Sequence, residues 1–132
     1  MKIKDKSKKK IVNSLLNLTI NNDINEISID EIITNSGLSR GTFYNHFRNK
    51  NDIIIYLEKV MCKSLDDAFY DISPENENYM DIMTHRILPL VYENREYTKI
   101  LYKYYQPSFF DFIVKRYSVF YKIFWSLWRK GS

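Results

Sequence analysis

Apolar side chains recur at every third or fourth position along most of the chain, which is the periodicity of an α-helix and not of a β-strand. The first run consists of Ile11, Val12, Leu15, Leu16 and Leu18. The second begins after Lys50 and consists of Ile53, Leu57, Val60, Met61, Leu65, Ala68, Phe69 and Ile72. The pattern predicts one amphipathic helix near the amino terminus and one long helix after residue 50.

Between these runs, residues 28–37 have the signature of a short helix followed by a sharp turn. Ser28 precedes Glu31 by three positions, the spacing of a capping box, and Ile27 and Ile32 have the spacing of a hydrophobic staple. Gly37 stands where the chain must adopt a left-handed conformation to leave a helix, which glycine does without steric cost. A helix is therefore predicted from Ser28, with a turn at Gly37.

A second short helix is predicted to begin at Ser39, because Leu38 and Phe43 repeat the staple spacing around this capping residue. Phe43 and Phe47 lie four positions apart and should face inward. The remaining surface is polar, cationic and aromatic, with Arg40, Gly41, Thr42, Tyr44, Asn45 and His46. Two helices joined by such a turn form a helix-turn-helix, whose second helix reads the major groove of DNA.

The next helix is predicted to start at a third cap, in which Asn49 is followed by Asp52. This places Lys50 at a helix amino terminus, where an anion such as phosphate is favoured. The outward residues also have a purely structural interpretation: Tyr44 as part of the core, Asn45 as solvated surface and His46 as an ordinary flanking residue.

The run from Ser28 to Ile53 resembles the amino-terminal domain of the TetR family of bacterial transcription regulators. The resemblance implies that one set of residues contacts phosphates and positions the protein, namely Ser28, Ser39, Tyr44, His46 and Lys50. It implies that another set faces the groove and selects the sequence, namely Arg40, Gly41, Thr42 and Asn45. Two departures are Ile33, where the family usually has alanine, and the loop Asn21–Ile24, which lacks the usual glycine.

Composition agrees with an all-α protein, because the 132 residues include only 3 glycines and 3 prolines while 45% are hydrophobic. The net charge of +4 is concentrated at the amino terminus, in Lys2, Lys4, Lys6, Lys8, Lys9 and Lys10. This basic segment has two interpretations, a tail that follows phosphates or a disordered, solubilising end.

The single Cys62 excludes an internal disulfide, and His46 and His85 are too few and too far apart to indicate a metal site. No cofactor is expected. The amino terminus has no apolar run resembling a signal or a membrane span, so a cytoplasmic protein without a membrane partner is expected.

The proposed domains are a helix-turn-helix DNA-binding domain at residues 1–50 and a shortened helical effector-binding and dimerisation domain at residues 51–132. A linker is predicted at residues 73–78, followed by helices at 79–93 with a kink at Pro89, at 95–105 and at 107–130. The last of these is aromatic on nearly its whole circumference, which predicts a homodimer contact.

The leading hypothesis is a ligand-responsive repressor that binds a palindromic operator in double-stranded DNA as a homodimer. A small-molecule effector follows from the family resemblance, but no ligand-binding residue is assigned. The alternative is a truncated regulator that pairs with another protein through its aromatic helix and does not itself read DNA. An enzyme is not expected, because the sequence has no nucleophile elbow and no phosphate-binding glycine loop.

Overall fold

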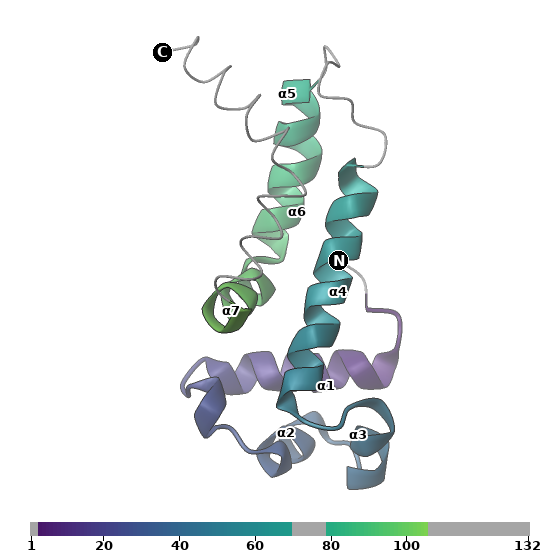
Figure 1. Ribbon diagram of the computed structural model, residues 1–132, viewed down its shortest axis with the longest axis vertical. Helices are drawn as coiled ribbons and strands as arrows, with labels where there is room; N and C mark the ends of the chain where they lie inside the picture. Colours follow the sequence, from purple (N-terminus) through teal and green to yellow (C-terminus); the bar gives the residue numbers. More distant parts are fainter. Residues whose placement is uncertain (1–2, 70–78, 106–132) are drawn as a thin grey trace. The chain divides into compact units, whose positions relative to one another are not determined.

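The computed structural model describes residues 3–69 and 79–105, and these residues form helices and turns without a strand (Figure 1). The predicted all-α fold is thereby confirmed. The chain divides into two compact units, Met1–Ser64 and Leu65–Ser132. The boundary proposed after residue 50 divides the chain by function, into a DNA-binding domain and an effector-binding and dimerisation domain. It stays a prediction.

The first unit contains α1 (Lys6–Thr19), the short 3₁₀ helix η1 (Ile24–Glu26), α2 (Ile29–Ser36) and α3 (Arg40–His46). It also contains most of α4 (Lys50–Phe69), which continues into the second unit. The buried apolar residues of this unit are Ile11, Val12, Leu15, Ile24, Ile27, Ile32, Phe43, Phe47, Ile53, Ile54, Leu57 and Met61. Most of the periodic residues that predicted the helices therefore also form the core, whereas Leu16, Leu18 and Val60 are half-buried.

Helix α1 begins earlier than the apolar pattern indicated, because Asp5 caps it. The Asp5 carboxylate accepts a hydrogen bond of 2.9 Å from the backbone N–H of Lys8. Lys6, Lys8, Lys9 and Lys10 thus belong to a helix, so the disordered interpretation is wrong for these four lysines. The ammonium of Lys8 also lies 4.8 Å from the ring centroid of Tyr56, which connects α1 to α4.

The end of α1 shows how the chain turns without the glycine that the family usually has there. All described residues other than glycine have negative φ angles. The side-chain amide of Asn22 donates to the carbonyl of Leu18 at 3.1 Å, and Asp23 then caps η1 by accepting from the N–H of Asn25 at 2.9 Å. The side chains of Asn22 and Asp23 therefore satisfy the Leu18 carbonyl and the Asn25 N–H. In a helix that ends at a left-handed glycine, backbone N–H groups would instead bond to the last carbonyls.

Helices α1 and α2 are joined by one buried polar contact. The hydroxyl of Ser14, only 2% exposed, donates to the backbone carbonyl of Ile32 at 2.9 Å. Ile33, at the position of the family's usual alanine, is half-buried. The larger side chain is thus accommodated at the edge of this core.

The second unit contains the end of α4, then α5 (Tyr79–Ile82), the π-helical turn η2 (Met83–Ile87), α6 (Leu88–Glu93) and α7 (Arg95–Tyr105). The buried side chain of Ile87 packs against a small apolar cluster consisting of Ala68, Phe69, Ile82 and Met83. The predicted linker at 73–78 and the predicted helix at 107–130 lie outside the described residues, and with them the aromatic terminal surface.

Pro89 was predicted to kink the helix at 79–93. The structure has a wide, π-helical turn just before Pro89, and the helix is not broken there. Pro89 has no N–H for the carbonyl of His85, and its ring would crowd that carbonyl in a regular helix. The N–H of Leu88 instead bonds back to Met83, five positions earlier. The predicted helix at 79–93 is therefore present as α5, η2 and α6 in succession.

A buried asparagine forms the corner between α6 and α7. The side-chain amide of Asn94 donates to the carbonyl of Leu90 at 2.7 Å, and the Asn94 carbonyl accepts from the N–H and the hydroxyl of Thr98, both at 3.0 Å. The predicted helix at 95–105 begins directly after this corner and is confirmed as α7.

Candidate DNA interface

The amino terminus of α2 has the predicted capping box. The hydroxyl of Ser28 accepts from the N–H of Glu31 at 3.1 Å, while the Glu31 carboxylate accepts from the N–H of Ser28 at 2.9 Å. Ile27 and Ile32, the predicted staple pair, are both buried. Helix α2 ends at Gly37, whose φ of 72° is the predicted left-handed conformation.

Helix α3 begins at the second predicted cap. Ser39 Oγ accepts from the N–H of Thr42 at 3.1 Å, and the two hydroxyl groups lie 2.8 Å apart. The Thr42 hydroxyl is thus engaged at the helix end, and its side chain is half-buried. Thr42 therefore belongs to the cap as much as to the outward surface.

The two faces of α3 differ sharply in exposure. Phe43 is fully buried and Phe47, the residue that ends the helix, is 4% exposed. Arg40, Gly41 and Asn45 are exposed on the other side. Because α3 turns its apolar residues inward, it leaves exposed three of the four residues predicted to select a DNA sequence, the exception being the half-buried Thr42.

Gly41 is notable because nothing within the part of the chain that the structure describes requires glycine there. Its conformation is helical, and a Cβ built at this position would have no neighbour within 4 Å. The missing side chain instead leaves room for another molecule's backbone or bases to approach α3 closely.

Tyr44 and His46 lie on the flanks of α3. The ring of Tyr44 meets Phe43 edge-on at a centroid distance of 5.2 Å, yet the side chain is 45% exposed. His46 is half-buried, and its ring centroid lies 6.5 Å from that of Phe47. Tyr44 is thus partly core, because one side of its ring packs against Phe43, and partly available for the predicted phosphate contact, because the other side is exposed.

Arg40 has a partner that sequence analysis did not identify. Its Nη2 donates to Oδ1 of Asp30 on α2 at 2.5 Å, and the two side chains are 64% and 69% exposed. An acidic residue is common in the first turn of a helix, and Asp30 stands in that turn of α2. The sequence therefore gave no reason to expect a contact between Asp30 and a residue ten positions away.

Lys50 is also engaged within the protein. Its Nζ donates to the carbonyl of Ile24 in η1 at 2.9 Å. The predicted third cap is present beside it, with Asn49 Oδ1 accepting from the N–H of Asp52 at 2.9 Å. An ammonium has three donors, so this bond leaves Lys50 able to meet a phosphate at the same helix terminus.

Two titratable groups near α1 are shifted by their surroundings. The hydrogen bond from the backbone N–H of Lys8 lowers the pKa of the Asp5 carboxyl. Burial, with a smaller contribution from the negative charge of Asp5, raises the pKa of the Tyr56 phenol. Tyr56 also packs edge-on against Phe47 at a centroid distance of 5.6 Å, which joins α4 to the end of α3.

Together, a capped helix, a left-handed glycine turn and a second helix with an exposed polar face define a DNA-binding helix-turn-helix. Residues 11–57 match the family model described as "Bacterial regulatory proteins, tetR family". This part of the chain is therefore similar to the amino-terminal helix-turn-helix domain of the TetR family, a family of DNA-binding transcription regulators. No curated protein and no solved structure matches the chain significantly.

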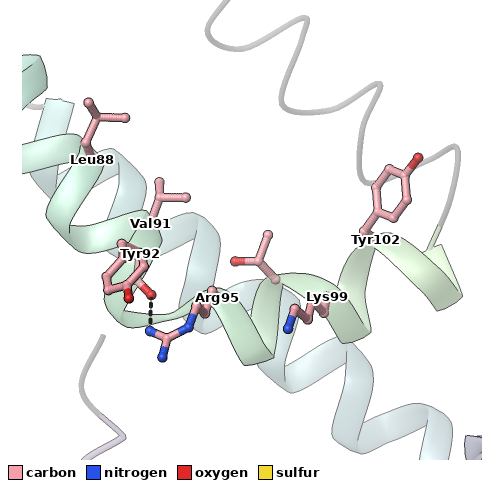
Figure 2. Close-up of a pocket in the computed structure, with 7 residues that line it drawn as sticks. Leu88, Val91, Tyr92, Arg95, Lys99 and Tyr102 are labelled. Carbon is pink, nitrogen blue, oxygen red and sulfur yellow. Dashed lines mark hydrogen bonds between the residues drawn. The ribbon is translucent and has the colours of Figure 1, made fainter.

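The second unit carries a surface groove along α6 and α7, with a volume of about 590 Å³ (Figure 2). Its lining residues recur at helical spacing and are Leu88, Val91, Tyr92, Arg95, Thr98, Lys99 and Tyr102. Leu88 is 58% and Tyr92 67% exposed. Such a run of exposed large apolar side chains is typical of a binding surface.

Two cations lie among these apolar residues. The guanidinium of Arg95 lies 4.3 Å from the ring centroid of Tyr92, and its Nη1 donates to the Tyr92 carbonyl at 2.9 Å (Figure 2). Lys99 Nζ is 3.3 Å from a carboxylate oxygen of Glu96. The groove thus offers apolar and aromatic contact together with positive charge.

Within residues 3–69 and 79–105 no helix is long and apolar enough to cross a membrane. The same residues contain no group of three or more side chains that could together hold a metal ion.

Proposed function

We propose that this regulator is a repressor that binds a palindromic operator as a homodimer. The observation that carries the proposal is the division of α3 into a buried aromatic face and an exposed face with Arg40, Gly41 and Asn45. In this role the exposed residues select bases, since arginine pairs well with guanine and asparagine with adenine.

The remaining candidate residues position the protein on phosphates in this proposal. Ser28 and Ser39 stand at the amino termini of α2 and α3, and Lys50 stands at that of α4. Helix termini and cations of this kind bind phosphate oxygens. Thr42 adds to the groove-facing set, and Tyr44 and His46 add their flanking side chains to the phosphate contacts.

The experiment that tests this proposal is selection of bound sequences from a randomised duplex pool, run in parallel on the wild type and on Arg40→Ala. A palindromic motif, with relaxed preference at one base pair of each half-site in the variant, is the expected result. Recovery of no motif, with only weak and salt-sensitive binding, would instead support the alternative of a partner protein that does not read DNA alone.

Homodimer formation follows in this proposal from the symmetry of the operator. Two recognition helices must meet half-sites about one duplex turn apart, roughly 34–36 Å. Sedimentation of the full chain with and without operator DNA checks this. A monomer at micromolar concentration that also binds the operator singly would contradict it.

Ligand response is assigned in this proposal to the second unit, and the α6–α7 groove is its candidate surface. Apolar and aromatic walls with Arg95 and Lys99 suit a small amphipathic acid. Such a ligand releases the operator only if it binds the two states of the regulator with different affinity.

A panel of small aromatic and aliphatic acids would test this assignment. An effector should raise the melting temperature of the full chain and weaken operator binding, and both effects should be lost in Tyr92→Ala. Unchanged effector response in this variant would exclude the groove as the effector site.

A further inference from the structure

The contact between Asp30 and Arg40 joins the two helices of the helix-turn-helix. We propose that Asp30 is a specificity-determining residue, whose carboxylate orients the Arg40 guanidinium toward one base pair and disfavours the alternatives. This inference rests on the proposed role of Arg40 in the groove. It assigns a function to a residue of α2 that neither the motif nor the helix periodicity singles out.

The geometry supports a directed pair. Asp30 lies in the first turn of α2 and Arg40 is the first residue of α3, so the hydrogen bond of 2.5 Å spans the turn at Gly37. Both side chains are more than half exposed. The pair therefore lies at the protein surface on the outward side of the motif, where Arg40 is accessible to DNA.

Neither helix needs this pair for its own end. Helix α2 is already closed by the capping box of Ser28 and Glu31, and α3 by the hydroxyl of Ser39. Arg40 instead adds a positive charge at the positive end of α3, where the helix dipole disfavours it. Because exposed ion pairs contribute little to folding stability, the effect of Asp30 is to be sought in DNA binding and not in the stability of the fold.

A guanidinium held in this way is better prepared to read a base. It has five N–H donors, so one bond to Asp30 leaves donors for the O6 and N7 atoms of guanine. A free arginine side chain must give up rotamer freedom to bind, and a partner that holds it beforehand reduces this loss.

The carboxylate also acts against wrong sequences. Its negative charge repels phosphates and the acceptor atoms of base edges, whereas it can accept a hydrogen bond from the amino group of cytosine or adenine. A repulsive element of this kind lowers affinity for most DNA and raises discrimination between sequences. Asp30 thus lowers the affinity for DNA in general while it raises the selectivity between DNA sequences.

The test is Asp30→Asn in the full chain, measured against the operator found by selection, its single-base variants and random-sequence DNA. We expect binding to random DNA to become tighter and the preference at one base pair per half-site to fall by about tenfold, within the usual range for a single base contact. A purely structural role would lower affinity for all sequences alike and leave the preference unchanged.

Three further variants sharpen the comparison. Glu26→Gln makes the same charge change at an exposed carboxylate of η1 and should tighten binding without changing base preference. Asp30→Ala shows whether the result depends on asparagine. Adding Asp30→Asn to Arg40→Ala should change base preference no further, because the two residues act on the same base pair.

The outcomes separate the inference from the proposed function. If the wild type selects no motif, both are overturned. If the wild type selects a motif that Arg40→Ala relaxes while Asp30→Asn and Asp30→Ala preserve it, the regulator reads DNA as proposed and the role given to Asp30 is wrong.

Discussion

At the scale of single residues, two glycines four positions apart are present for opposite reasons. Gly37 has a φ of 72°, a conformation that other residues adopt only with strain. Gly41 lies within α3 and has open space around it. The backbone conformation at Gly37 favours glycine, whereas at Gly41 the structure leaves room for a side chain, and the proposed close approach of DNA is what would favour glycine there.

Alanine at each glycine should therefore have opposite effects on stability. Gly37→Ala should lower the free energy of unfolding by about 1–2 kcal/mol, because alanine is strained at positive φ. Gly41→Ala should raise it by up to about 1 kcal/mol, because alanine favours a helix interior. Urea denaturation measures both, and equal signs would contradict this account.

The same two variants separate folding from DNA binding. Under conditions in which both proteins are folded, Gly41→Ala should weaken operator binding and Gly37→Ala should change it little. Stronger operator binding by the more stable Gly41→Ala would show that DNA does not approach α3 closely at this position.

Lys50 combines a structural and a proposed binding role in one side chain. Lys50→Ala should lower the free energy of unfolding by up to about 1 kcal/mol, because the Ile24 carbonyl loses the Lys50 donor and keeps only the weaker bond from the N–H of Ile27 at 3.2 Å among those described. It should also weaken binding to every DNA sequence to a similar degree. Lys59→Ala, which removes an exposed charge from the same helix, is the matched control and should leave stability nearly unchanged.

At the scale of helices, the sequence predicted what local chemistry determines. The caps at Ser28, Ser39 and Asn49 and the turn at Gly37 depend on residues three or four positions apart, and all are present. Short-range patterns of this kind can be read from sequence because the interacting groups are neighbours along the chain.

What the sequence did not predict depends on contacts between distant positions or on weak local signals. The pair of Asp30 with Arg40 and the bond from Lys50 to Ile24 are visible only once the helices pack together. The apolar pattern did not define the start of α1, because lysines carry no apolar periodicity, although Asp5 was available as a cap. The proposed DNA contacts stay predictions, since they concern a second molecule.

The cap of α3 provides a prediction at this scale. Ser39→Ala should lower the free energy of unfolding by about 1 kcal/mol, because an orphan N–H loses its acceptor. Ser39→Asp should keep the cap and the stability but weaken DNA binding, since its charge repels phosphate. Equal DNA affinity of Ser39→Asp and the wild type would exclude a phosphate contact here.

At the scale of the whole molecule, two half-buried phenols, those of Tyr56 and Tyr97, predict the response to alkaline pH. Burial raises the pKa of Tyr97 above the ordinary 10.0, and burial with the charge of Asp5 does the same for Tyr56. Above pH 10.0 the unfolded chain loses these protons while the folded protein retains them, so stability falls as pH rises through the folded pKa values.

Denaturation curves at neutral and alkaline pH would check this response. The variant with both Tyr56→Phe and Tyr97→Phe should lose less stability on going to alkaline pH than the wild type. An equal loss in both proteins would assign the alkaline sensitivity to other groups.

Helix α4 starts in the first unit and ends in the second, so between residues 50 and 69 there is no loop at which the DNA-binding part could be detached cleanly. A fragment ending at residue 50 would lack Ile53, Ile54 and Leu57, which are buried. A chimaera that joins this recognition motif to another regulator at the boundary between the two units would therefore be spliced inside α4, after Ser64. Adding or deleting one residue at that splice would rotate the remaining residues of α4, as far as Phe69, by about 100° about the helix axis, because an α-helix has 3.6 residues per turn.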